Sequence, residues 1–198
     1  MYNAGIRTRL HSLIKEKALK FGDFTLASGK KSTFYLDCRQ ITLDSEGVAL
    51  VGASILEVIE AAFRPLPQAV GGMSIGADPI TASVLVAAFS RRIPLKGFMV
   101  RKQPKDHGTG KCVEGPVQAG DHVVIVEDVV TTGGSSLEAI ERVEAIGCIV
   151  DGVIASSTGL KAGKKPSKRR AIPFARYTLF GTSTSRSNRR GVHRHPIL

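Results

Sequence analysis

The sequence predicts an α/β domain with a central parallel sheet flanked by helices, and two observations carry this prediction. The first is the alternation of short apolar runs with longer helical segments between residues 44 and 155. The second is the run His122–Val126, which is almost continuously apolar, as in a parallel strand covered on both faces. Ligands of such sheets bind beyond the carboxyl ends of the strands, so we expect a binding site there.

The first forty residues predict a helix, a loop and a strand. Residues 5–20 carry apolar side chains at helical spacing, which indicates an amphipathic helix against the core. Ser28–Ser32 reads as a tight loop, and Thr33–Leu36 as a short strand. The apolar stripe of the first helix consists of Ile6, Leu10, Leu13 and Ile14.

The remaining elements follow a rhythm of strand, loop and helix. Asp44 is expected to cap a helix that continues to about Phe63, where the proline-rich segment 64–67 ends it. The strands expected after it are 69–72, 95–100, 122–126 and 148–155, and the helices are 77–90 and 135–146.

Composition narrows the class of protein. The chain has 198 residues, of which 42% are hydrophobic and 23% charged, as in one folded domain of ordinary size. It contains no apolar run long enough for a membrane span or a secretory signal, so we expect a cytoplasmic protein that does not bind membranes. Cys38, Cys112 and Cys148 lack the spacing of a zinc site or a disulfide framework, so reduced thiols are expected.

The positive charge is confined to one end of the chain. Up to Ile154 there are 17 basic and 17 acidic residues, whereas from Ala155 onward there are 11 basic residues and no acidic ones. The segment 156–198 is therefore interpreted as a basic, atypical tail without helical or strand periodicity, which we expect to be poorly ordered. Such a tail is either a solvated appendage or an arm that binds nucleic acid, and we favour the appendage.

The stretch VVIVEDVVTTGGS joins a buried strand to two acids and a glycine-rich turn that opens a helix. Residues 131–135 can offer backbone N–H groups and hydroxyls to a phosphate at the positive end of that helix. Glu127 and Asp128 would repel a phosphate, so they are better placed to accept hydrogen bonds from the hydroxyls of a sugar that carries it. The alternative is a capped helix after an acidic turn.

This stretch resembles the phosphoribosyl pyrophosphate signature of type I phosphoribosyltransferases. Three further stretches, FTLASGKKSTFYLDCRQITL, AVGGMSIGADPI and VRKQPKDHGTGKCVEGP, are similar to orotate phosphoribosyltransferases, in the same order, over residues 20–155. The resemblance implies a type I phosphoribosyltransferase-like domain at 1–155, with a small N-terminal hood from about 1–43 and a core at 44–155. The implied reaction transfers ribose 5-phosphate from phosphoribosyl pyrophosphate to orotate, giving orotidine 5′-monophosphate and pyrophosphate for UMP synthesis.

The resemblance also implies site residues, a cofactor and a partner. Lys105 and His107 would lie in a catalytic loop that closes over the active site of a neighbouring subunit, so a homodimer with shared sites is implied; alone, this loop would read as a solvated basic hairpin. Asp128 would join them as a catalytic residue. Magnesium (Mg2+) would be held mainly by pyrophosphate and ribose oxygens, with no dedicated protein ligand. The residues expected to bind phosphoribosyl pyrophosphate are Arg101, Lys102, Lys105, His107, Glu127, Asp128, Val129, Val130, Thr131, Thr132, Gly133, Gly134 and Ser135. Those expected to contact orotate are Thr131, Phe34 and Tyr35.

Two loops carry weaker indications. Lys30 and Lys31 lie in a turn near which substrate would arrive, while Ala27 stands where many relatives carry a phosphate-contacting lysine. Asp78, beside Pro79, is expected either to shape its turn or to contact substrate.

The tail departs from the family pattern, which continues with V-D-R-x-E-G-G, whose arginine contacts orotate, and later S-L-[FY]-T. Codons that encode Ser157–Lys165, preceded by one added G, regroup to V-D-R-L-E-G-G-K-E, and codons compatible with Phe174–Ser183 regroup in the same frame to V-R-S-L-Y-T-I-R-D-L. A single frameshift near residues 154–157 accounts for both missing segments and for the charge step. With this tail we expect an uncovered strand edge, exposed apolar surface, reduced solubility and poor transfer activity.

Two other functions remain open from the sequence. One is a different type I phosphoribosyltransferase, because the phosphate motif is shared while the base-recognising residues are incomplete. The other is a non-catalytic regulator that senses phosphoribosyl pyrophosphate and binds nucleic acid through the tail, in a manner that weakens steeply with salt.

Overall fold

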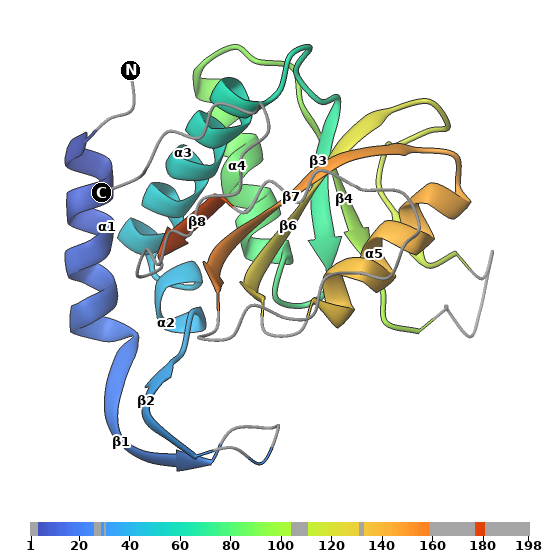
Figure 1. Cartoon of the computed structure of the whole chain (residues 1–198). Coiled ribbons are helices and arrows are strands. Elements are labelled where there is room, and N and C mark those ends of the chain that lie inside the picture. Colours follow the sequence, from blue (N-terminus) through green and yellow to red (C-terminus); the bar gives the residue numbers. More distant parts are fainter. Residues whose placement is uncertain are drawn as a thin grey trace, which may run out of the picture.

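A six-stranded sheet forms the centre of the molecule (Figure 1). The computed structural model describes residues 4–25, 29, 31–103, 111–130, 133–158 and 177–180. The strands are parallel except for the antiparallel edge pair β4 and β5. In spatial order they are β5 (Val113–Glu114), β4 (Lys96–Val100), β3 (Ala69–Met73), β6 (His122–Val130), β7 (Ile149–Thr158) and β8 (Tyr177–Phe180). The predicted α/β class with a central, mostly parallel sheet is confirmed.

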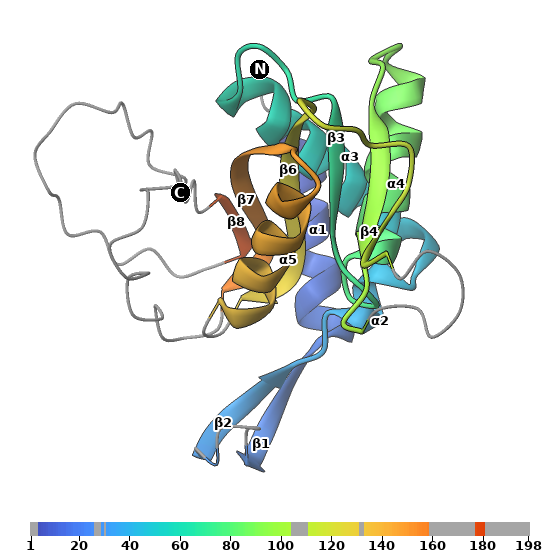
Figure 2. The same ribbon diagram turned by 90° about the vertical axis from the view of Figure 1, so that its right-hand side faces the viewer.

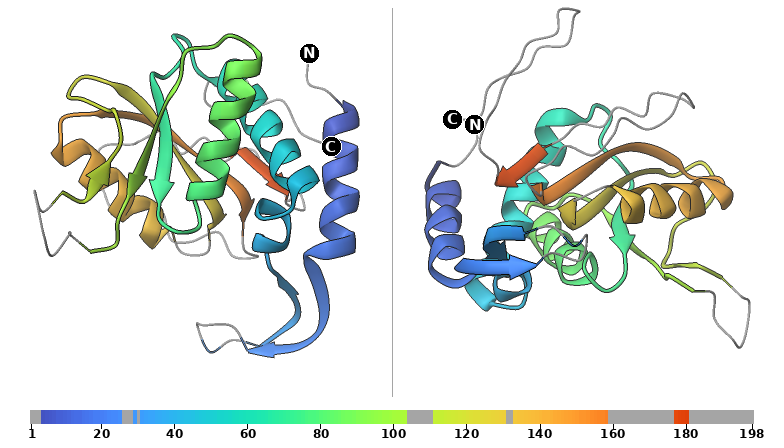
Figure 3. Two further views of the ribbon diagram at one scale, coloured as in Figure 1. Left: turned by 180° about the vertical axis from the view of Figure 1, so that it is seen from behind. Right: turned by 60° about the horizontal axis from the view of Figure 1, so that its bottom comes forward.

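Helices cover both faces of this sheet (Figure 2). On one face lie α3 (Ser45–Ala62) and α4 (Asp78–Ser90), with α1 (Ala4–Lys17) packed outside α3, as the view from behind shows (Figure 3). On the other face lies α5 (Gly134–Ala145). Because alternate side chains of β6 point to opposite faces, Val124 and Val126 join the first core and Val123 and Ile125 the second.

The range of about 1–43 that was predicted as an N-terminal hood contains α1 and three smaller elements. These are the antiparallel hairpin of β1 (Leu19–Thr25) and β2 (Lys31–Leu36), and the short helix α2 (Arg39–Thr42). Figure 1 shows the hairpin projecting beyond the end of the sheet at which β3, β4 and β6 finish. The hood therefore stands at the carboxyl edge, where ligands of parallel sheets bind.

Helix α3 begins and ends as local chemistry dictates. The Asp44 carboxylate accepts a hydrogen bond of 2.9 Å from the N–H of Gly47, so the predicted N-cap is confirmed. The helix ends before the Arg64–Pro65 bond, since a residue that precedes proline is disfavoured in helical conformation. Gly52 lets α3 approach α4 closely, because a Cβ there would lie 2.5 Å from the carbonyl oxygen of Ser83.

Several strands differ from the sequence-based expectation. β6 continues to Val130 and β7 to Thr158, because their hydrogen-bonded ladder extends past the acids, with Val129 opposite Ser157. β1 was not expected, since its sequence LKFGDFT lacks a clear alternation. β8 lies within the tail and pairs in parallel with β7, with Ile154 opposite Tyr177. The expectation of an uncovered strand edge is therefore wrong along these residues of β7.

Candidate functional site

The two acids of the phosphate motif lie near the carboxyl end of β6 and turn toward different neighbours. The hydroxyl of Ser136, on the first turn of α5, donates a hydrogen bond of 3.1 Å to Oε2 of Glu127. The Asp128 carboxylate lies against the turn after β3, because a Cβ built on Gly76 would lie 3.0 Å from its Cγ. β6 thus presents one carboxylate to α5 and the other to the β3–α4 turn.

Glu127 has an unusual titration. Its side chain is buried, and this burial, followed by the negative charge of Asp128, raises its pKa to about 7. The hydrogen bond from Ser136 and the charge of Lys102 act in the opposite direction. In the described part of the chain neither Glu127 nor Asp128 forms an ion pair within 4.0 Å, so both can accept hydrogen bonds from a ligand.

The turn between β3 and α4 is a part of the site that the sequence alone indicates only weakly. Ser74 Oγ donates a hydrogen bond of 2.9 Å to Oδ1 of Asp78, which ties the ends of this turn together. Of the two roles left open for Asp78, the structure shows this turn contact. The strand order offers a signal that could have identified the turn: β3 and β6 are neighbours, so the residues directly after β3 must lie beside the acids of β6.

The glycine-rich turn opens α5 as expected. Gly133 is its N-cap and has φ 86°, a left-handed conformation that side-chain-bearing residues rarely adopt. A glycine cap has no side chain to bond the first-turn N–H groups, so this helix end is suited to an anion. Gly134 and Ser135 form its first turn, and Val129 and Val130 close β6 before it. Thr131 and Thr132 lie outside the described residues.

The basic segment comes directly after β4, on the strand beside β3. The N–H of Arg101 donates to the carbonyl oxygen of Cys112 (2.8 Å), and its guanidinium Nη1 lies 3.8 Å from Oε1 of Glu114. Lys102 lies close enough to Glu127 for its charge to lower the pKa of that carboxyl. The structure therefore brings this basic strand end to the acids of β6. Lys105 and His107 lie outside the described residues.

The hood residues proposed for orotate contact do not share one face. Phe34 and Tyr35 are consecutive in β2, so their side chains point to opposite sides of the hairpin. Tyr35 packs its ring against Phe24, with ring centroids 5.6 Å apart. Lys31 is exposed at the start of the strand, and Ala27 and Lys30 lie outside the described residues. A planar ligand could stack on one of the two rings, but not on both from the same side.

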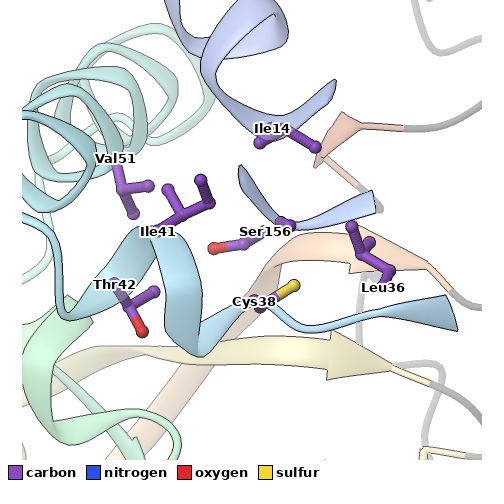
Figure 4. Close-up of a pocket in the computed structure, with 8 residues that line it drawn as sticks. Ile14, Leu36, Cys38, Ile41, Thr42, Val51 and Ser156 are labelled. Carbon is purple, nitrogen blue, oxygen red and sulfur yellow. The ribbon is translucent and has the colours of Figure 1, made fainter. Parts of the chain in front are cut away.

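A small apolar pocket lies where the hood packs against the core (Figure 4). Side chains from α1, β2, α2, α3 and β7 line it, including those of Cys38 and Ser156. Burial, followed by the charges of Asp128 and Asp37, raises the pKa of the Cys38 thiol to about 12. Cys38 is therefore a protonated packing residue rather than a nucleophile.

Within the described ranges, no group of three or more His, Cys, Asp or Glu side chains is arranged to hold a metal ion. The same residues include no helix that is long and apolar enough to cross a membrane.

Comparison with known proteins identifies relatives over most of the chain. The orotate phosphoribosyltransferase of Rhodopirellula baltica is 49% identical over 172 residues, which cover 85% of this chain and 89% of that protein. That of Aquifex aeolicus is 39% identical over 180 residues, covering 89% and 96%. No protein-family model matches the chain.

Solved structures agree in fold. The orotate phosphoribosyltransferase of Mycobacterium tuberculosis in complex with Fe(III) dicitrate superposes with a TM-score of 0.67 at 34% identity, covering 77% of this chain and 84% of that one. The same enzyme in complex with 5-phospho-α-D-ribosyl 1-diphosphate gives a TM-score of 0.63 at 31% identity, covering 77% and 83%.

Proposed function

Because the chain belongs to the orotate phosphoribosyltransferases, we propose that the carboxyl edge of its sheet binds phosphoribosyl pyrophosphate and transfers the ribose 5-phosphate group to N1 of orotate. The products are orotidine 5′-monophosphate and pyrophosphate. A solved relative binds phosphoribosyl pyrophosphate, which supports the choice of donor.

One observation carries the assignment of roles: two carboxylates that form no ion pair with any described residue precede a helix that opens on a glycine. Glu127 and Asp128 would accept hydrogen bonds from the ribose hydroxyls. The segment Thr131–Ser135 would hold the 5-phosphate through N–H groups and hydroxyls at the positive end of α5. The two acids would thus bind the sugar of the donor, and the segment Thr131–Ser135, called the phosphate cradle below, would bind its 5-phosphate.

The chemistry requires little more than positioning and charge. The bond between the anomeric carbon and the pyrophosphate oxygen breaks, the new bond to N1 forms, and positive charge develops on the sugar. Arg101, Lys102, Lys105 and His107 would neutralise the leaving pyrophosphate, while Asp128 would stabilise the sugar's positive charge. Phe34, Tyr35 and Thr131 remain our proposal for contact with orotate.

We propose Mg2+ as the cofactor. The ion would be held mainly by oxygens of the donor and by water. When bound, Mg2+ would offset the negative charge of the pyrophosphate. Arg101 and Lys102 would bind the remaining oxygens of that group.

The proposed assembly is a homodimer in which Lys105 and His107 serve the neighbouring site. The test mixes two inactive variants, Lys105→Ala and Asp128→Asn. If sites are shared, mixed dimers contain one site with both residues intact, so activity returns on mixing. Absence of recovery in a mixture shown to exchange subunits would overturn the proposal that the sites are shared.

The free thiols of Cys38, Cys112 and Cys148 support the cytoplasm as the proposed compartment.

The deciding experiment measures pyrophosphate release with orotate, adenine and hypoxanthine. It uses this chain and a second version in which one G precedes the codon of Ser157, so that the frame regains V-D-R. We expect release with orotate alone, and faster turnover by the second version because it regains the arginine. Release with a purine would overturn the substrate assignment. Equal turnover by both versions would overturn the proposed loss of activity through the tail.

A further inference from the structure

Helix α5 contacts the basic segment through one arginine. Nη2 of Arg142 donates a hydrogen bond of 2.9 Å to the main-chain carbonyl oxygen of Lys102. The same guanidinium pairs with Glu138, one turn earlier on the helix. The Arg142 side chain is 21% exposed, and its bond to the exposed Lys102 main chain joins this mostly covered guanidinium to the surface.

The main chain around Lys102 is held from two sides. On one side, the N–H of Arg101 donates to the carbonyl oxygen of Cys112, which continues the edge of the sheet beyond β4. On the other side, Arg142 holds the carbonyl oxygen of Lys102 itself. The charge of the Lys102 ammonium lowers the pKa of Glu127, and the position of this backbone limits the region that the ammonium can reach.

Both parts of the donor site depend on the same helix. Gly134 begins α5 at the proposed phosphate cradle, and Arg142 comes eight residues later, about 12 Å along the axis at 1.5 Å per residue. Because a helix of this length is stiff, it sets the distance between the cradle and the Lys102 backbone.

We propose that Arg142 is a positioning residue for donor binding: it fixes the Lys102 main chain to α5 and so aims the Lys102 ammonium at the phosphoribosyl pyrophosphate held by the cradle. The inference rests on the proposed function, in which Lys102 binds the pyrophosphate group. Arg142 itself does not touch the donor. Arginine suits this task because its Nη2 carries two hydrogens, so that one nitrogen can serve the carbonyl oxygen of Lys102 and the carboxylate of Glu138 at once.

The test measures the affinity for phosphoribosyl pyrophosphate by calorimetry, which requires no turnover. We expect Arg142→Ala to weaken binding about tenfold, a typical effect of one lost charge-assisted hydrogen bond. Arg142→Lys should recover part of the loss. The matched control is Arg91→Ala, which removes an arginine that pairs with Glu57 and Glu60 on the far side of the sheet and should leave the affinity unchanged.

A double-mutant cycle separates positioning from general destabilisation. If Arg142 acts through Lys102, the variant Lys102→Ala with Arg142→Ala binds no more weakly than Lys102→Ala alone. Multiplied losses, or an unchanged affinity of Arg142→Ala, would overturn the proposal.

A second readout needs no ligand. Trypsin cleaves after Lys102, and loss of the anchor should raise the cleavage rate at this bond severalfold in Arg142→Ala but not in Arg91→Ala. An unchanged rate would overturn the anchor. If the unmodified chain binds no phosphoribosyl pyrophosphate, the proposed function fails, and the cleavage rates decide the anchor by themselves.

Discussion

Acidic side chains at the two ends of the sheet lie in opposite electrostatic environments. At the amino end, the Asp121 carboxylate lies 2.8 Å from Nζ of Lys96 and accepts a hydrogen bond from the N–H of Gln118, and these contacts lower its pKa. At the carboxyl end, burial and a second acid raise the pKa of Glu127 to about 7. An acid whose hydrogen bonds and charge are satisfied within the protein serves stability, whereas an acid that forms no ion pair among the described residues is suited to a ligand.

The sharpest test of this contrast exchanges one acid at each end for its amide. Asp128→Asn should weaken binding of phosphoribosyl pyrophosphate about 10- to 100-fold, because a charged hydrogen bond to the sugar is lost, with little change in the melting temperature. Asp121→Asn should do the reverse, with unchanged affinity and a stability lower by about 1–2 kcal/mol. Calorimetry and thermal unfolding of both variants check this; equal effects at the two ends would break the comparison.

A smaller effect is expected from crowding the carboxyl end without changing its charge. The new methyl group of Gly76→Ala would lie 3.0–3.1 Å from the Asp128 carboxyl atoms, so the carboxylate must move. We expect an affinity for phosphoribosyl pyrophosphate about fivefold weaker, the equivalent of about 1 kcal/mol of strain. Titration calorimetry measures it. An unchanged affinity would show that the position of Asp128 does not matter to the donor.

The contribution of Asp121, at the amino end of the sheet, to the free energy of unfolding should be lost in acid. The folded-state pKa of Asp121 lies below its ordinary value of 3.8, so its contribution is present above that pH and is lost as the pH falls through the folded value. Denaturant unfolding between pH 5 and pH 2 (about 0.1 M salt) should therefore show a shallower loss in Asp121→Asn than in the unmodified chain. Parallel curves would contradict this assignment.

The carboxyl end should respond to pH with the opposite sign. The folded-state pKa of Glu127 is raised from 4.5 to about 7, so its contribution is complete below pH 4.5 and is lost as the pH rises through 7. Glu127→Gln cannot ionise, so its stability relative to the unmodified chain should rise across this interval, by a few degrees in melting temperature. A relative stability that does not change with pH would show that Glu127 titrates normally.

The smallest effect is expected at Cys38. Because its thiol has a pKa of about 12 and is buried, iodoacetamide at pH 8 should leave it unmodified in the folded protein, as mass spectrometry of the peptides can show. Cys38→Ala should keep the donor affinity within about twofold, since the thiol packs and does not react. Rapid alkylation would place Cys38 in an open part of the site.

Local signals explain which parts of the fold could be predicted. The cap at Asp44 and the apolar run of β6 each depend on residues close together in the sequence, so both could be predicted. The contact between the β3–α4 turn and Asp128 could not, because it joins residues about fifty positions apart through the order of strands. The Arg142 contact with Lys102 was missed for the same reason: nothing in either local sequence indicates the other.

The candidate site shows the same division. Glu127, Asp128 and the glycine turn lie in one motif and were predicted together, and in the structure the acids lie in β6 and Gly133 caps α5. Phe34 and Tyr35 were predicted as a pair, although the alternation of a strand separates them. Ser136 was not predicted, but a hydroxyl on the first turn of the helix after two acids is a signal that could have indicated it.

Strand β8 shows how the sheet of this protein can tolerate changes in the sequence of the tail. A β-ladder is made from main-chain N–H and C=O groups, which every reading frame encodes alike, so closing the edge beside β7 requires an extended segment rather than a particular sequence. Even an altered tail can thus pair with β7, which makes the four-residue strand β8 the edge of the sheet, and so short an edge offers few main-chain groups to other molecules. Protection from misassembly is in this sense more tolerant of mutation than chemistry is.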